Sequence, residues 1–403
     1  MPGVMTMMAV APSPCLSVKP ARLCSISSKE LLVKKRSSSS AHLLRRSWAA
    51  RAAATAATAT ATDPYVEQQM MQRLAEDGWV DEHILPLLTP VEEAWQPADL
   101  LPSFASSADE QRSQVAELQA RAAGVPDDLL VCLVGNTVTE ESLPTYMCMA
   151  NRVAGGSDDT GRDGHGWARW LRGWTAEENR HGDLLNRYLY LSGRVDMAAV
   201  ERTVHHLLRA GMRAIPRPTS AYHSLIYGAF QERATFVSHA RTAGAAARHG
   251  DACLAKICGV IAADERRHEA AYTRASARAF EEDPDGMVRA LAAVMRAKVT
   301  MPGELMADGR DGRLFDHFSA VAQRSGVYTA ADYADMVEHF VRRWKVAELG
   351  AGLSSEGRRA QDFVCGLPRK IRRMEELAHD RAAKMEAQSV NFSWVFDRPV
   401  RTQ

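Results

Sequence analysis

The chain has 403 residues, of which 46% are hydrophobic and 25% charged, the composition of an ordinary globular protein. No run of 18 or more apolar residues occurs, so no membrane-spanning helix is expected. Without the nine basic residues and one acidic residue of the first 62 positions, residues 63–403 keep 41 basic and 48 acidic side chains, and this net charge of −7 argues against nucleic acid as a partner.

Residues 1–62 differ in composition from the rest. Glu30 is their single acidic residue, and Ser and Ala are abundant. A basic, Ser-rich, acid-poor leader is typical of an organelle transit peptide, which would be disordered and cleaved before a domain spanning residues 63–403. A disordered tail without a targeting role is the alternative, and composition alone leaves chloroplast and mitochondrion both open.

From about residue 65 onward the pattern is helical. Helix-breaking residues occur at Pro97 and Pro102 and in the stretches 155–166, 192–194, 215–219 and 282–286. They separate segments of about 20 to 30 residues, long for globular helices. This pattern predicts an all-α fold with one large helical domain, smaller helices at each end, and a short strand pair in the C-terminal NFSWVFDRPV. The seven cysteines form no CxxC motif, which disfavours a disulfide framework or a thiolate zinc site.

Three Glu-x-x-His triplets occur, and their positions on helical faces separate them. Glu178 and His181 share a face with the apolar residues Trp167, Leu171, Trp174, Leu185 and Tyr188. Glu265 and His268 share one with Leu254, Cys258, Ile261 and Tyr272. The third apolar stripe runs through Ile371, Met374, Ala378, Ala382 and Met385, and leaves Glu376 and His379 off it. We therefore interpret the third triplet as chance, and expect Glu177 to point away from the face of Glu178.

Two more glutamates complete a recognisable ligand set. Glu140 shares a stripe with Leu130, Leu133, Thr137 and Met147, and Glu232 shares one with Leu225, Ala229 and Phe236. Pro144 cannot donate a hydrogen bond to the carbonyl of Glu140, so the helix should distort there. Buried carboxylates are costly unless paired or bound to metal. Single glutamates on two helices and Glu-x-x-His on two others match the dinuclear carboxylate site of ferritin-like helical bundles, with oxygen and nitrogen ligands that suit iron or manganese.

Several long stretches, EENRHGDLLNRYLYLSGRVDM, FQERATFVSH, ADERRHEAAYT and LFDHFSAVAQRSGVYTA, resemble the plant-type soluble acyl-[acyl-carrier-protein] desaturases of the stearoyl type. The resemblance runs from about residue 64 to residue 400. It implies a homodimer of ferritin-like bundles with two Fe²⁺ per subunit, a chloroplast transit peptide and a location in the plastid stroma. The implied reaction inserts a cis double bond, at Δ9, into a stearoyl or palmitoyl chain on acyl carrier protein, with O₂ and reduced ferredoxin.

The resemblance also implies roles for individual residues. The metal ligands would be Glu140, Glu178, His181, Glu232, Glu265 and His268; which glutamates bridge stays open. Thr235 matches a Thr beside the oxygen pocket, Asp264 a partner of a ligand imidazole, and Trp95 a Trp on the electron route, although simple packing explains Trp95 nearly as well. Met149, Arg152, Ser224 and Leu225 would line the acyl tunnel. Arg152 and Ser224 replace usually smaller residues, and we expect them to favour a shorter chain such as palmitoyl.

The implied partners would need a basic docking site on this protein. Acyl carrier protein and ferredoxin are acidic, so docking on an acidic protein requires a local basic patch; the candidates are Arg342, Arg343 and Lys345, or Arg369, Lys370, Arg372 and Arg373. Two other functions fit a ferritin-like bundle: iron storage or oxidation without an organic substrate, and a non-catalytic carrier-binding role.

Overall fold

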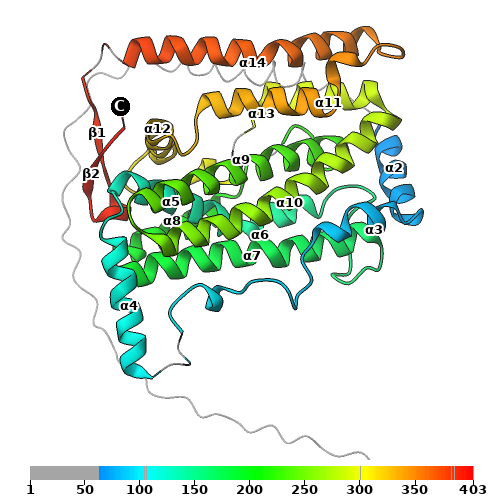
Figure 1. Ribbon diagram of the computed structural model, residues 1–403. Helices are drawn as coiled ribbons and strands as arrows, with labels where there is room; N and C mark the ends of the chain where they lie inside the picture. Colours follow the sequence, from blue (N-terminus) through cyan, green and yellow to red (C-terminus); the bar gives the residue numbers. More distant parts are fainter. Residues whose placement is uncertain are drawn as a thin grey trace, which may run out of the picture. The chain divides into compact units, whose positions relative to one another are not determined.

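The structure is a computed structural model of the chain, and it describes residues 63–402 apart from positions 104, 106, 214, 300, 383 and 385. The predicted transit peptide, residues 1–62, lies outside the described residues. The described part is almost entirely helical, which confirms the all-α prediction (Figure 1). Within it, no helix combines the length and apolarity that crossing a membrane requires.

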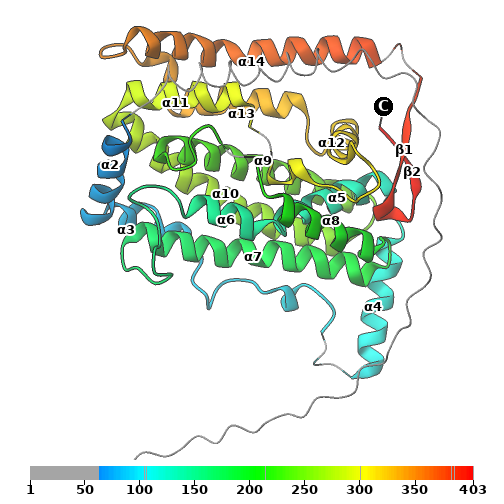
Figure 2. The same cartoon turned by 180° about the vertical axis from the view of Figure 1, so that it is seen from behind.

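Four helices form the centre of the fold: α5 (Asp127–Glu140), α7 (Gly166–Ser192), α9 (Ala221–Arg248) and α10 (Ala252–Glu282). Helix α9 packs along α10, and α7 packs against both α5 and α10. The turn between α9 and α10 is short, with Gly250 at a φ of 83°, so the two helices run antiparallel (Figures 1 and 2). The Asp251 side chain accepts a hydrogen bond from the Leu254 N–H and fixes the start of α10.

Helix α5 is interrupted where the sequence predicted it. It ends at Glu140, and α6 (Leu143–Ala150) begins with Pro144 in its first turn. Proline lacks the N–H that would continue the hydrogen-bond ladder, so the chain turns at Glu141 and Ser142 before it becomes helical again. Helix α5 is therefore only 14 residues long, shorter than the segments expected from the breaker pattern.

Other helices surround these four. They are α2 (Pro64–Glu76), α3 (Trp79–His83), α4 (Ala108–Ala122), α8 (Met197–Ala210), α11 (Pro284–Ala297), α12 (Leu314–Ser325), α13 (Ala330–Arg343) and α14 (Ser355–Ala382). Helix α14 packs over α11 and α13 at one side of the molecule (Figure 1). Short 3₁₀ turns lie at Leu85–Leu87, Pro97–Asp99, Pro302–Leu305 and Val346–Glu348. The non-helical segment between the first two turns crosses the face of α7 and α10.

The predicted strand pair is confirmed at the C-terminus. Strands β1 (Ser389–Phe392) and β2 (Arg398–Arg401) are antiparallel, with Val390 opposite Val400, and the 3₁₀ turn Ser393–Val395 joins them. The Trp394 side chain is fully buried and donates from Nε1 to the hydroxyl of Thr203 on α8. The hairpin therefore closes one end of the helical bundle.

Helix α14 differs in part from its predicted stripe. Its buried residues are Gly357, Ala360, Val364, Pro368 and Ile371, whereas Met374 is 61% exposed. The Glu375 carboxylate already accepts a hydrogen bond from Ala331 at the start of α13, so the residues after it lie beyond that helix. Met374 is exposed although it lies on the stripe, and Glu376 and His379, which lie off it, are exposed as well, in agreement with a chance triplet.

The hydrophobic core has two parts, and the predicted metal residues lie between them. On α7, Trp167, Trp170 and Trp174 belong to one part, and Leu184 and Tyr188 belong to the other. Glu178 and His181 occupy the intervening turn. The polar cluster is thus enclosed by apolar packing on both sides.

Candidate metal centre

Six buried side chains from α5, α7, α9 and α10 converge between the two parts of the core. They form two overlapping groups whose oxygen and nitrogen atoms lie within 4.8 Å of one another: Glu140, Glu178, His181 and Glu265, and Glu178, Glu232, Glu265 and His268. These are the six residues that the sequence predicted as ligands. The structure brings all of them together, and their role as ligands stays a prediction.

The two groups share two members, Glu178 and Glu265. A carboxylate common to two adjacent sites could offer one oxygen to each, so Glu178 and Glu265 are the residues that would bridge two metal ions if both sites were filled. Glu140 and His181 lie on one side of them, and Glu232 and His268 lie on the other. This arrangement indicates which glutamates could bridge, a question that the sequence left open.

The donor atoms fit divalent cations. His181 Nδ1 and Glu265 Oε1 are 3.2 Å apart, and neither has a hydrogen-bond partner among the described residues. His268 Nδ1 is 2.9 Å from Glu178 Oε1 and 3.5 Å from Glu232 Oε2. Unpaired buried polar atoms that face one another imply a missing ligand. An oxygen and imidazole set without thiolate suits iron or manganese, and four carboxylates balance two divalent charges.

The electrostatics of the cluster are consistent with a bound cation. Burial raises the pKa of Glu140 and of Glu232 above the ordinary glutamate value, and burial together with the neighbouring Glu178 raises the pKa of Glu265 to about 8. Burial opposes ionisation of Glu178 as well, but the His181 imidazole outweighs it and lowers that pKa. Bound metal would favour the ionised form of all four carboxylates.

One carboxylate orients His181 from outside the cluster. His181 Nε2 lies 3.3 Å from Oδ2 of Asp264, and the same oxygen accepts a hydrogen bond of 3.1 Å from Trp95 Nε1. The Trp95 ring stacks on the His181 ring at 6.1 Å, and the Arg180 guanidinium lies over Trp95 at 4.4 Å. Asp264 therefore has the position predicted for it, and Trp95 contacts both Asp264 and His181.

Glu177 orients the second histidine, which the sequence reasoning missed. Its Oε2 lies 3.0 Å from His268 Nε2, and its Oε1 accepts a hydrogen bond of 2.6 Å from the Thr89 N–H. Glu177 does lie off the face of Glu178, as predicted, but it is buried against the segment that crosses α7 and α10. The lone signal available in the sequence was its position directly before a ligand.

Arg267 links these two outer carboxylates. Its Nη2 donates to Glu177 Oε2 at 3.1 Å and to Asp264 Oδ1 at 2.8 Å, and its Nε donates to the Leu87 carbonyl at 3.2 Å. The far nitrogens of His181 and His268 are thus joined through one continuous chain of polar contacts. Such outer contacts fix the ring orientation of metal-binding histidines.

Three of the four carboxylates in the cluster have hydrogen-bond partners outside it. His239 Nε2 lies 3.0 Å from Glu140 Oε1, Trp174 Nε1 donates to Glu232 Oε1 at 3.0 Å, and the Thr235 hydroxyl donates to Glu265 Oε2 at 2.8 Å. Thr235 lies beside the cluster as predicted. His239 and Trp174 were not recognised from the sequence as partners of the ligands.

Two cavities meet at the cluster. The inner cavity, of about 130 Å³, lies among α2, α6, α7 and α9. The outer cavity, of about 280 Å³, lies among α5, α9, α12 and α13. Thr139, Glu140, Gln231 and Thr235 line both cavities, and both are predominantly apolar. The two cavities therefore lie on either side of these four shared residues, next to the carboxylate cluster.

The structure places three of the four predicted tunnel residues in the inner cavity: Met149, Ser224 and Leu225. Arg152 is exposed and lines neither cavity, so its prediction as a tunnel residue was wrong. Helix α6 ends at Ala150, and in the turn that follows it is Val153 whose side chain is buried and lines the cavity. Val153 follows Met149 by four residues, the spacing of one helical face, and Arg152 falls beside that face.

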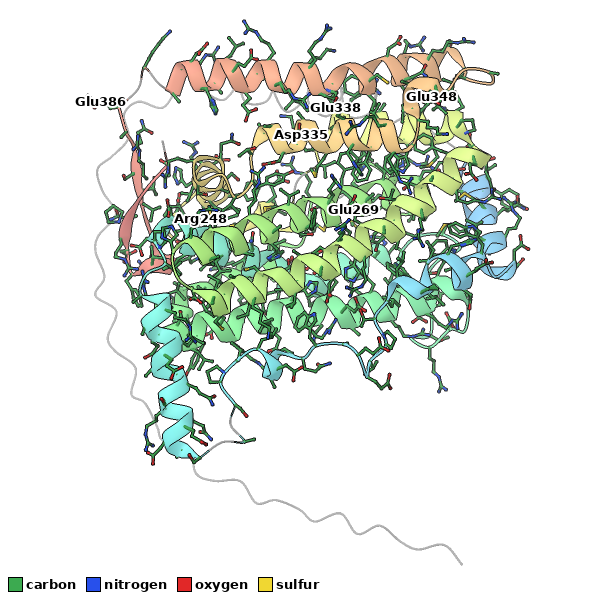
Figure 3. All side chains as sticks on the ribbon, in the orientation of Figure 1. Arg248, Glu269, Asp335, Glu338, Glu348 and Glu386 are labelled. Atoms are coloured by element: carbon green, nitrogen blue, oxygen red, sulfur yellow. The ribbon has the colours of Figure 1, made fainter. Side chains whose placement is uncertain are left out.

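The predicted basic docking patches are unequal. Arg372 of α14 pairs with Asp335 and Glu338, which lie on α13 on the side toward α14 (Figure 3). Arg373 pairs with Glu376. Arg342, Arg343 and Lys345, by contrast, are all exposed. Their part in docking stays a prediction.

The fold is a helical bundle whose buried carboxylates and imidazoles are grouped so that they could hold a metal ion. The family described as "Fatty acid desaturase" matches residues 67–396. The chain is 66% identical over 361 residues to acyl-[acyl-carrier-protein] desaturase 4, chloroplastic, of Oryza sativa subsp. japonica, which covers 88% of this chain and 86% of that protein. It is 56% identical over 326 residues to stearoyl-[acyl-carrier-protein] 9-desaturase, chloroplastic, of Spinacia oleracea, covering 81% and 80% of the two chains. The chain belongs to this fatty acid desaturase family.

Proposed function

We propose that the protein is an acyl-[acyl-carrier-protein] desaturase, which inserts a cis double bond at Δ9 of a saturated acyl chain with O₂ and electrons from ferredoxin. The observation that carries this proposal is the pair of apolar cavities, since both are lined by Glu140 of the carboxylate cluster and by Thr235 beside it; we propose that they join into one channel with two arms. An acyl chain threaded through both arms would bring its middle carbons beside the metals. Positioning of this kind is the main contribution of a protein to cofactor chemistry.

The exposure of the lining residues indicates through which cavity the acyl chain would enter. Phe315, Ser319 and Gln323 of the outer cavity are partly exposed, whereas Met71 and Trp167 of the inner cavity are buried. The acyl chain would therefore enter through the outer cavity, with its carrier protein outside, and place its methyl end in the inner cavity. Stearoyl is the proposed substrate, and palmitoyl is proposed to be used relatively well; with Arg152 outside the channel, this second part depends on Ser224 and Leu225.

The six clustered residues would hold two Fe²⁺, and the bound metals would supply the redox chemistry with O₂. In the overall balance, two hydrogen atoms leave adjacent carbons, ferredoxin supplies two electrons that are matched by two protons, and O₂ ends as two molecules of water. The chain's own residues hold the acyl carbons in place and exclude water through apolar walls. The Thr235 hydroxyl lies where the two cavities meet and can donate a hydrogen bond there.

Trp95 and Asp264 are proposed as the route for electrons. Together they connect the crossing segment to His181 through the contacts described above. The relatives are named chloroplastic. We propose that residues 1–62 are a chloroplast transit peptide and that residues 63–403 act in the plastid stroma as a homodimer.

The experiment that tests this function is anaerobic loading of residues 63–403 with Fe²⁺, followed by ferredoxin, O₂ and either stearoyl- or palmitoyl-carrier protein. Gas chromatography of the released fatty acids would detect a monounsaturated product, with the double bond between C9 and C10. Glu265→Gln, which changes a proposed bridging ligand, would abolish the product. The matched Glu376→Gln variant, in the exposed third triplet, would retain it.

The alternatives give different results in the same experiment. Iron storage or oxidation predicts Fe²⁺ oxidation at the wild-type rate with no fatty acid product, and also a large cage by size-exclusion chromatography. A non-catalytic carrier-binding role predicts binding of acyl carrier protein without product. Bound iron with no unsaturated product from either acyl chain would refute the desaturase proposal.

A further inference from the structure

The inner cavity ends at a wall made by residues outside the four central helices. Trp167, which lines this end, precedes Glu178 by 11 residues on α7, so it lies about 16 Å from the cluster along the helix axis. Met71 of α2 and Gly156 of the loop before α7 line the cavity beside it. All three residues are buried, so the cavity is closed here.

Met71 is held firmly at this wall. Its carbonyl accepts a hydrogen bond of 2.9 Å from Nε1 of Trp167. Helix α2 is further tied to the start of α9, because the buried Glu67 carboxylate accepts hydrogen bonds from the Ser220 hydroxyl and the Tyr222 N–H. The position of Met71 is therefore set by three hydrogen bonds that do not involve its own side chain.

The loop opposite Met71 approaches closely because it contains glycines. Gly155 has a φ of +79°, and a Cβ placed there would lie 2.6 Å from the Gln68 carbonyl. A Cβ on Gly156 would lie 3.0 Å from Cε of Met71 and 3.7 Å from Cβ of Trp167. The terminal methyl of Met71 and the bare Cα of Gly156 thus face each other at the closed end. A methyl group added at Gly156 is therefore in tight contact with Met71 Cε, which has to shift to make room for it.

We propose that Met71 and Gly156 set the length of acyl chain that the enzyme accepts beyond the metal centre. This inference rests on the proposed desaturase function and adds the residues that determine its specificity. Met71 contributes a flexible, unbranched side chain that a substrate methyl group would touch end-on. Gly156 leaves the room that this contact needs. A shorter side chain at position 71 lengthens the pocket, and a side chain at position 156 shortens it.

The chain offers a matched control for Met71. Met70 is its neighbour in α2 and is equally buried, at 2% against 3% exposure, but it does not line the cavity. Met71→Ala and Met70→Ala therefore remove the same atoms from the same helix, and a general loss of packing affects both. Gly164 is an exposed loop glycine with nothing within 4 Å of its Cβ position, so Gly164→Ala is the control for Gly156→Ala.

The test is a competition among palmitoyl-, stearoyl- and arachidoyl-carrier proteins, with kcat/KM ratios taken from the product mixture. A hydrophobic pocket discriminates by about tenfold or more per methylene. Met71→Ala is expected to raise the ratio of longer to shorter substrate by at least about tenfold, and Gly156→Ala is expected to lower it by a similar factor. Met70→Ala and Gly164→Ala are expected to keep the wild-type ratio.

The outcomes separate this inference from the proposed function. No product from the wild-type protein with any chain would refute the function. Product from the wild type, with the same ratio in Met71→Ala as in Met70→Ala and no change in Gly156→Ala, would overturn the inference alone. If Met71→Ala does not fold, as judged by circular dichroism, the opposite shift expected of Gly156→Ala still decides the matter.

Discussion

Glu177→Gln tests whether a residue that binds no metal controls metal affinity. The Glu177 carboxylate accepts at both oxygens, from Thr89 N–H at 2.6 Å and at 3.0 Å from His268 Nε2. A glutamine amide has the same shape but a single acceptor oxygen, so either the Thr89 N–H loses its partner, or the donors at Oε2, His268 Nε2 and Arg267 Nη2, lose theirs. A hydrogen bond to a charged group contributes about 1.5–3 kcal/mol, and 1.4 kcal/mol corresponds to tenfold in affinity.

The variant is therefore expected to bind Fe²⁺ about 10- to 100-fold more weakly, as found for outer partners of metal-bound histidines in general. Anaerobic Fe²⁺ titration against a competing chelator measures this change. Glu141→Gln is the matched control, since Glu141 follows the ligand Glu140 as Glu177 precedes Glu178 but contacts no ligand histidine. Equal affinities for Glu177→Gln, Glu141→Gln and wild type would refute the reasoning.

The remaining predictions concern the cluster and its surroundings. The pKa of Glu265 is raised to about 8. In the metal-free folded protein this side chain therefore stays protonated above the ordinary glutamate pKa, so the free energy of unfolding falls as pH rises from that pKa toward 8, and metal binding displaces the proton. Stabilisation by Fe²⁺, measured as the shift in Tm, is expected to grow from pH 6 to pH 8, with apparent affinity rising about tenfold per unit; a shift independent of pH would contradict this. Trp95→Phe removes the hydrogen bond to Asp264 and is expected to leave iron content unchanged but slow reduction by ferredoxin in stopped-flow measurements; an unchanged rate would favour simple packing. Ser224→Ala removes a buried hydroxyl that has no hydrogen-bond partner in the described structure and is expected to raise the free energy of unfolding by up to about 1 kcal/mol in urea titrations, whereas a loss of stability would show that the hydroxyl is bonded.

The fold and the six clustered residues could be predicted from the sequence because each depends on a local pattern. Glu178 and His181 lie three residues apart on an apolar face, so one helix presents both toward the core whatever it packs against. Pro144 predicted the end of α5 at Glu140 for a similar reason, since the missing N–H acts within one turn. Patterns of this kind require no knowledge of how the helices are arranged.

Arg152 was predicted from the resemblance and not from a helical pattern. The structure leaves it exposed, whereas Met149 and Val153, four residues apart, line the cavity. Met374 lies in α14 next to Glu375, which meets Ala331 at the start of α13, and it is exposed although it continues the apolar stripe. Periodicity identifies a face, and burial of that face depends on what packs over it.

Contacts across helices could not be read from the sequence at all. Glu177 meets His268 because α7 and α10 pack with one particular rotation, and it is buried only because the segment containing Thr89 covers it. Arg267, which directly precedes His268 on α10, likewise donates to Glu177 on α7. In both cases the outer partner is adjacent in sequence to a ligand of its own helix and bonds to the opposite helix. The pattern is reciprocal: Asp264 precedes Glu265 and holds His181, and Glu177 precedes Glu178 and holds His268. A residue one step before each ligand glutamate points about 100° around its helix, toward the far nitrogen of the histidine on the facing helix, so the two Glu-x-x-His helices orient each other's histidines.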